Sequence, residues 1–216
     1  MKQRIVLLTV LTATVCFYAY GYVAALVNEA QRQNGIVKII VREHNGTYAS
    51  GSGVVVGDNY VVTAKHVVEG TCHVMVNAKE ASIVALSKGH DLALLHVREL
   101  NVTPLPILHS PPRGGESLVA VGYPHMGDRM AFFGNAIYTD RDLVVTSARV
   151  EGGQSGGALL AMRVKDRRHH KWYVAGITVG FFVTVLGDGT KIENNNRSVS
   201  VSPVIVSEFV NKYIQD

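Results

Sequence analysis

A serine set among glycines, Ser155, follows a histidine, His66, and an aspartate, Asp91, in this chain of 216 residues. Serine is a weak nucleophile at neutral pH, and it needs an adjacent base to take its proton as it attacks. An imidazole can act as that base, and a carboxylate can fix its tautomer and stabilise its cation. The three residue types, in the order histidine, aspartate, serine, therefore indicate acyl transfer by an activated serine.

The backbone around Ser155 suits a second requirement of the same chemistry. A tetrahedral intermediate carries an oxyanion, which needs two converging backbone N–H donors. Gly153 and Ser155 are predicted to supply them, because glycine lets the backbone approach a substrate without a Cβ clash. The sequence therefore predicts an oxyanion hole at Gly153 and Ser155, within the run GGQSGG at 152–157.

Several longer segments surround these residues: GSGVVV at 51–56, YVVTAKHVV at 60–68, DLALL at 91–95, GESLVAVGYP at 115–124 and TSARVEGGQSGGAL at 146–159. Together they resemble the trypsin-like (chymotrypsin-fold) serine proteases, and most closely the HtrA/DegP branch. The resemblance runs from about Gly35 to the C-terminus. It implies His66 as general base, Asp91 as the residue that orients it, and Ser155 as nucleophile. It also implies that no cofactor or metal ion takes part.

Short apolar strands separated by turns predict an all-β fold. The resemblance implies two packed antiparallel β-barrels, the first over about 35–108 and the second over about 115–201, with the substrate cleft between them. After Ser202-Pro203, an apolar stripe predicts a closing C-terminal helix over 203–215. Turns are predicted at Asn45-Gly46, Gly187-Asp188-Gly189 and Asn194-Asn195-Asn196.

The stretch from Ile5 to Val27 contains no charged residue. A membrane-spanning helix needs about 20 apolar residues, so residues 1–34 are predicted to form a signal anchor, an N-terminal transmembrane helix followed by a polar linker at 28–34. The basic residues Lys2 and Arg4 would keep the N-terminus cytoplasmic and place the protease domain, 35–216, on the periplasmic or extracellular side. The alternative is a signal peptide cleaved at Val23-Ala24-Ala25, which would give a secreted protein.

Composition limits the other function classes. The formal net charge of +4 is too small, and the cations too scattered, to indicate a nucleic-acid partner. The adjacent histidines His169 and His170 have no further residue at a metal-ligand spacing, so we expect no metal site there. Cys16 and Cys72 lie in dissimilar segments and are not expected to pair.

The segment before Ser155 and the strand Gly176–Phe181 are expected to line the primary specificity pocket, with Arg149, Thr178, Val179 and Gly180 as substrate-binding residues. In the resembling family, the position of Arg149 often lies at the base of that pocket. An inward Arg149 would select acidic side chains, whereas an outward Arg149 would leave apolar walls that select small or aliphatic ones. An unpaired buried guanidinium is costly, which favours the outward orientation.

The sequence thus predicts a serine endopeptidase that hydrolyses polypeptides through an acyl-enzyme. The alternative from another class is a non-catalytic binding or chaperone-like module on the same fold. The presence of all three candidate residues favours the enzyme.

Overall fold

The computed structural model describes residues 2–166 and 169–214, with backbone alone for 2–11, 13–14, 164–166 and 169. The first half of the chain forms a closed barrel of six antiparallel strands in the order β1-β2-β3-β6-β5-β4. Its members are β1 (Ile36–Glu43), β2 (Tyr48–Gly57), β3 (Tyr60–Thr63), β4 (Thr71–Val76), β5 (Lys79–Leu86) and β6 (Ala93–Val97).

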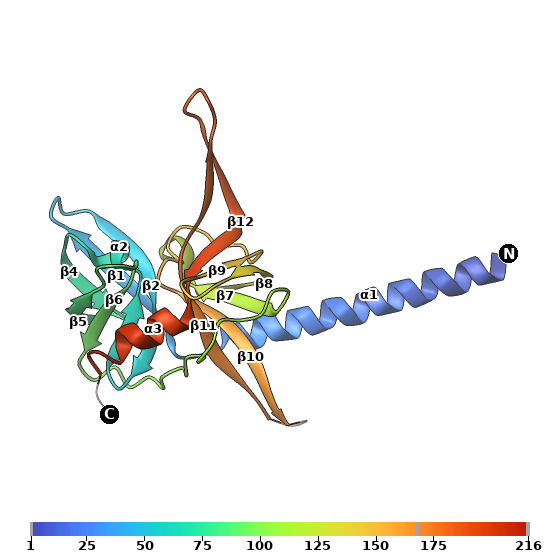
Figure 1. Ribbon diagram of the computed structural model, residues 1–216, viewed down its shortest axis with the longest axis horizontal. Helices are drawn as coiled ribbons and strands as arrows, with labels where there is room; N and C mark the ends of the chain where they lie inside the picture. The colour runs from blue at the N-terminus through green and yellow to red at the C-terminus, as the bar shows by residue number, and fades with distance from the viewer. Residues whose placement is uncertain (1, 167–168, 215–216) are drawn as a thin grey trace.

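The second half forms another closed barrel of six antiparallel strands, in the order β10-β11-β12-β9-β8-β7. Its members are β7 (Ser117–Gly122), β8 (Met130–Thr139), β9 (Leu143–Thr146), β10 (Ala158–Asp166), β11 (His169–Val185) and β12 (Lys191–Val201). Figure 1 shows the two barrels side by side, with the hairpin of β11 and β12 and that of β10 and β11 projecting from the second in opposite directions. The predicted two-barrel, chymotrypsin-like fold is confirmed.

Three groups of buried apolar residues explain why the strands close in this way. Alternating side chains such as Val37 and Ile39 of β1 point into the first barrel, and Leu118 and Ala120 of β7 into the second, as expected when successive strand residues face opposite sides. A third and larger group joins the barrels, and it includes Leu94 with residues of β7, β10, β11 and the C-terminal helix. The barrels therefore share a continuous apolar seam.

Outside the barrels, the described residues form four helices: α1 (Lys2–Gln31), α2 (Lys65–Val68), the 3₁₀ turn η1 (Pro124–Met126) and α3 (Pro203–Val210). The predicted closing helix is present as α3, but it ends at Val210. Two predicted turns are also present, because Gly46 and Gly189 have φ of +86° and +83°. The third predicted turn is instead an irregular part of β12: Asn194 lies opposite Phe182, and the register then shifts so that residues 195–197 have no partner in β11.

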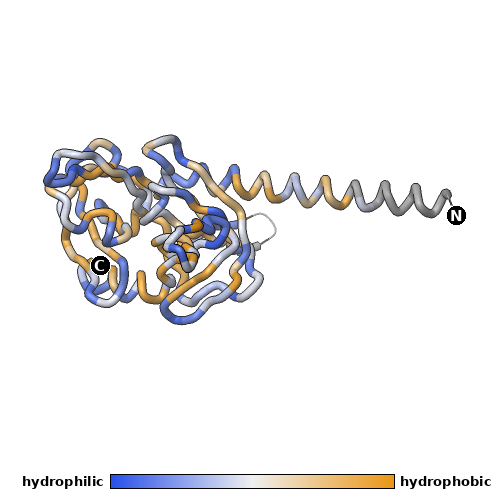
Figure 2. The backbone as a smooth tube through the Cα atoms, turned by 90° about the horizontal axis from the view of Figure 1, so that it is seen from above, coloured by the Kyte–Doolittle hydropathy of each residue, from blue (hydrophilic) through white to orange (hydrophobic). Residues whose placement is uncertain are grey.

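Helix α1 extends away from the second barrel (Figures 1 and 2). Its last turns replace most of the predicted linker, because Leu26 and Ala30 are buried in the core that joins the barrels. Gln31 Nε2 also donates to the Arg129 carbonyl at 2.5 Å, and the Arg129 guanidinium donates to the Gln33 carbonyl at 2.8 Å. In the described part of the chain, no helix combines the length and apolar character of a membrane span, and the predicted transmembrane helix is not found there.

Candidate active site

His66 lies on α2, directly after strand β3. Val67 and Val68 of the same helix are buried against the first barrel, and this holds the next face of the helix, with His66, toward solvent. The His66 backbone N–H donates to Asp91 Oδ1 at 2.9 Å, and its ring Nδ1 lies 2.5 Å from Asp91 Oδ2. Two contacts to one carboxylate fix both the position and the rotation of the imidazole.

Asp91 precedes β6 and is anchored by the buried Leu92 that follows it. Burial alone would raise the pKa of Asp91, but the hydrogen bonds it accepts from the His66 ring and backbone, together with the charge of His66, outweigh burial and hold that pKa below its usual value. The carboxylate therefore stays ionised, as a partner that stabilises an imidazolium must.

Ser155 lies in the loop between β9 and β10, and contacts to both barrels position this loop. The Ser155 carbonyl accepts a hydrogen bond from the N–H of Ser52 on β2, at 2.8 Å, and the Gly156 N–H donates to the Thr178 carbonyl at 2.7 Å. Gly156 has φ +82°, and a Cβ there would lie 2.1 Å from the Ser52 carbonyl oxygen. Only glycine allows the loop to approach the first barrel this closely.

The peptide groups before Ser155 are also held in defined orientations. The Gly152 carbonyl accepts from the His125 N–H at 2.8 Å, and the Gly153 carbonyl accepts from Ser52 Oγ at 2.8 Å. Because the N–H and C=O of one planar peptide point in opposite directions, the bond to His125 turns the Gly153 N–H away from η1. Among the described residues, the N–H groups of Gly153 and Ser155 have no hydrogen-bond partner, so both are available to a ligand.

Sequence reasoning missed three residues that shape this loop. Ser52 contacts it through both its N–H and its hydroxyl, and that hydroxyl also accepts from the Tyr123 N–H at 2.8 Å. Gln154 is almost fully buried, and its Oε1 accepts from the Glu151 N–H at 2.8 Å. The Ser52 position lies within the quoted GSG segment, which was the one available signal. Nothing in the sequence around His125 indicated a contact to Gly152.

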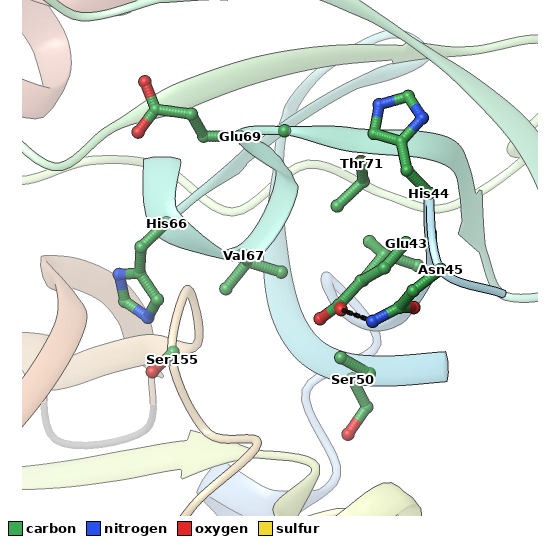
Figure 3. Close-up of a pocket in the computed structure, with 12 residues that line it drawn as sticks. Glu43, His44, Asn45, Ser50, His66, Val67, Glu69, Thr71 and Ser155 are labelled. Carbon is green, nitrogen blue, oxygen red and sulfur yellow. Dashed lines mark hydrogen bonds between the residues drawn. The ribbon is translucent and has the colours of Figure 1, made fainter. Parts of the chain in front are cut away.

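His66 and Ser155 line the same pocket, which has a volume of about 460 Å³. Figure 3 shows the two residues together at one side of this pocket, with the imidazole ring turned toward Ser155. All other lining residues belong to the first barrel: Val41, Glu43, His44, Asn45, Ala49, Ser50, Val67, Glu69, Gly70 and Thr71. The structure thus brings the three predicted catalytic residues, from segments far apart in the sequence, to one site.

The predicted substrate-binding residues lie outside this pocket. Arg149 points outward, half-exposed, with its guanidinium 2.8 Å from Glu151 and 5.9 Å from the centre of the Phe132 ring. Thr178 is buried and Gly180 is partly exposed. Arg149 is therefore not an unpaired buried guanidinium, because it is exposed and a carboxylate partner neutralises its charge.

No group of three or more potential metal ligands occurs among the described residues. The two cysteines, Cys16 and Cys72, are both exposed and unpaired with each other. The site thus consists of an imidazole, a carboxylate and a hydroxyl group, with two backbone N–H donors close to the hydroxyl.

Comparison with known proteins gives a family for this arrangement. The family model of the trypsin-like peptidase domain matches residues 51–164, more than half of the chain. The serine protease Rv3671c of Mycobacterium tuberculosis (strain ATCC 25618 / H37Rv) is 34% identical over 129 residues, 51% of this chain and 32% of that relative. The serine endoprotease DegS of Haemophilus influenzae is 30% identical over 127 residues, 51% of this chain and 37% of that relative. The chain thus matches about a third of the length of these relatives.

Solved structures of named proteases have the same fold as this chain. The active form of the Rv3671c protease from M. tuberculosis superposes with a TM-score of 0.72 and 26% identity, over 89% of this chain and 87% of that one. A serine endoprotease from Yersinia pestis shares the fold, with a TM-score of 0.70 and 24% identity over 88% and 66% of the two chains. The chain belongs to the trypsin-like peptidase domain family, and it is similar in sequence to Rv3671c and DegS.

Proposed function

We propose that the protein is a serine endopeptidase that hydrolyses polypeptides through His66, Asp91 and Ser155. The observation that carries this proposal is the pair of contacts between His66 and Asp91 in a pocket that Ser155 also lines. Family membership supports it, because the relatives Rv3671c and DegS are named serine proteases.

In the proposed reaction, the imidazole of His66 takes the proton of Ser155 as its Oγ attacks the carbonyl carbon of the scissile peptide. Asp91 stabilises the imidazolium that forms, while the N–H groups of Gly153 and Ser155 donate to the oxyanion. His66 then passes the proton to the leaving amine, and the peptide C–N bond breaks to give an acyl-enzyme. Water, deprotonated by His66, releases the acid product and restores Ser155.

The unpartnered N–H groups favour the enzyme over the non-catalytic alternative. In a binding module with a collapsed oxyanion loop, the Gly153 N–H would turn toward its own loop. Here the His125 N–H holds the adjacent Gly152 carbonyl at 2.8 Å, which directs the Gly153 N–H outward. This orientation is the one that an oxyanion requires.

Labelling with a fluorophosphonate tests the proposal directly, because the probe reacts only with an activated serine. We expect the unaltered protein to be labelled and to digest casein, and Ser155→Ala to lose both properties. Ser82→Ala, which changes an exposed serine on β5, is the matched control and should keep both. An unaltered, folded protein that takes no label would point instead to the binding module.

Three narrower points stay predictions. The primary pocket is expected beside Arg149, Thr178, Val179 and Gly180, and Arg149→Ala should leave the substrate profile unchanged because this side chain points outward. The protease domain is expected over 35–216. Export to the non-cytoplasmic side rests on the uncharged N-terminal run, and cell fractionation would test it.

A further inference from the structure

We propose that the pocket beside His66 binds a lysine or arginine side chain of the substrate, at the first or second residue after the cleaved bond, and that Glu43 is the residue that selects it. This inference rests on the proposed function and specifies part of its substrate class. The pocket is the 460 Å³ cavity between α2 and the β1–β2 hairpin.

The chemistry of the reaction decides which part of a substrate meets this pocket. His66 must give its proton to the leaving amine, so the substrate chain that follows the cleaved bond begins next to the imidazole. The pocket opens from His66 over first-barrel residues, and Ser155 is its one residue from the second barrel. The loop before Ser155, which is expected to hold the preceding residue, contributes no residue to this pocket. The pocket therefore receives the leaving-group side of the substrate.

The charges that line the pocket are negative. Glu43 and Glu69 are its two carboxylates, and no lysine or arginine is among the lining residues. Glu69 already has a cationic partner, because Lys65 Nζ lies 3.2 Å from its Oε1. Figure 3 shows the two carboxylates at separate edges of the pocket. Glu43 is therefore the carboxylate left to attract a cation.

Glu43 is held in place without being neutralised. Its Oε2 accepts hydrogen bonds from Asn45 Nδ2 at 3.2 Å and from Thr47 Oγ1 at 3.1 Å, and both donors are uncharged. Among the described residues, no lysine, arginine or histidine forms an ion pair with it. His44 also lines the pocket, and in Figure 3 its ring lies at the far edge, beyond Thr71. The carboxylate is thus oriented, and its charge has no counterion.

The wall between His66 and Glu43 is apolar. Figure 3 shows the Val67 side chain between them, and Val41 and Ala49 line the same cavity. Lysine and arginine bury their aliphatic stems on apolar surface while the charged end reaches a polar partner. An apolar stretch that leads from the catalytic histidine to an unpaired carboxylate fits that shape, whereas an acidic side chain would meet repulsion from Glu43.

Two quenched-fluorescence peptide pairs test the inference, each pair differing only by lysine or glutamine at the first or the second residue after the cleaved bond. For at least one pair we expect kcat/KM to be about fivefold higher with lysine, the size of effect that an exposed ion pair gives. Glu43→Gln should remove most of this ratio, by lowering kcat/KM for the lysine peptide toward that of the glutamine peptide. Raising the salt concentration should shrink the ratio in the unaltered protein, because salt screens exposed charges.

Glu80→Gln is the matched control, because Glu80 is an exposed carboxylate of β5 that pairs with His73 outside this pocket. It should keep the full lysine preference. Equal cleavage within both pairs, or a preference that survives both Glu43→Gln and high salt, would overturn the inference while leaving the protease intact. Labelling of Ser155 without cleavage of any of these peptides also counts against it. Absence of both labelling and cleavage would remove the proposed function itself.

Discussion

Gly156 shows how one residue without a side chain joins the two barrels. A Cβ at this position would lie 2.1 Å from both the Ser52 carbonyl oxygen and Thr63 Oγ1, and the backbone has φ +82°. Substitution therefore combines a steric clash with a left-handed conformation that L-residues avoid.

We expect Gly156→Ala to destabilise the folded protein by about 2 kcal/mol or more, which corresponds to a fall of about 5 °C in melting temperature. Thermal denaturation followed by circular dichroism would measure it. Gly114→Ala is the control, because a Cβ there meets no atom within 4 Å. Equal melting temperatures for the two variants would show that the loop adjusts without cost.

The lowered pKa of Asp91 leads to a second prediction at the scale of residues. Its pKa in the folded protein is lowered: hydrogen bonds from His66 more than offset the effect of burial. The ionised form therefore stabilises the fold fully above the usual pKa of an aspartate, and that contribution is lost as the pH falls through the lower, folded-state pKa. The contribution is small, because the Asp91 side chain is 34% exposed.

We expect Asp91→Asn to be less stable than the unaltered protein at pH 7, and the two stabilities to converge when the pH is brought below the usual aspartate range. Denaturation by urea across a pH series would measure the two free energies of unfolding. A difference that stays constant down to acid pH would mean that ionisation of Asp91 does not contribute to folding.

At the scale of elements, the C-terminal end of α1 behaves as part of the globular unit. Ala30 has no exposed surface, and Glu29 Oε1 lies 2.6 Å from His170 Nε2 of β11. A signal-peptide cleavage at Val23-Ala24-Ala25 would still leave Leu26 and Ala30 in place. This packing predicts that the end of the helix contributes to stability.

We expect Ala30→Arg to lower the free energy of unfolding by about 2 kcal/mol or more, because the new charge has no room where the helix meets the barrel. Ala25→Arg, on an exposed position of the same helix, should change little. Hydrogen exchange of the α1 amides, together with thermal denaturation, would measure both effects. Similar behaviour of the two variants would show that α1 does not dock in solution.

Strand β12 shows that a local turn signal can mark an irregularity within a strand instead of a turn between strands. Asparagine is a turn-favouring residue, so a run of three predicts a turn. In the fold, Asn194 pairs with Phe182, and the Asn195 carbonyl accepts from the Val150 N–H at 2.9 Å. The chain does not reverse at the asparagines, but the β11–β12 register shifts there. The bond to Val150 connects this irregular part of β12 to the segment that leads to Ser155.

For the whole molecule, the pattern of short strands predicted an all-β fold, and the resemblance to a protease family predicted that the strands form two barrels. Residue chemistry and chain order indicated acyl transfer by an activated serine, and the resemblance assigned the individual roles to His66, Asp91 and Ser155. Ser52 was out of reach because its hydroxyl binds a backbone carbonyl 101 positions away, at Gly153. Every residue has a backbone carbonyl, so the residue type at position 153 does not identify it as the partner of Ser52. The contact is known only once the two barrels are packed together.

Under the proposed function, the bond from the Ser52 N–H to the Ser155 carbonyl, at 2.8 Å, makes chemical competence depend on the integrity of the entire fold. When the two barrels separate, during synthesis or under heat, His66 lies on one and Ser155 on the other. The base can then no longer activate the nucleophile. Damaged copies would therefore be harmless to the proteins around them. For the same reason, a ligand that separates the two barrels would inhibit the protein without contacting His66 or Ser155.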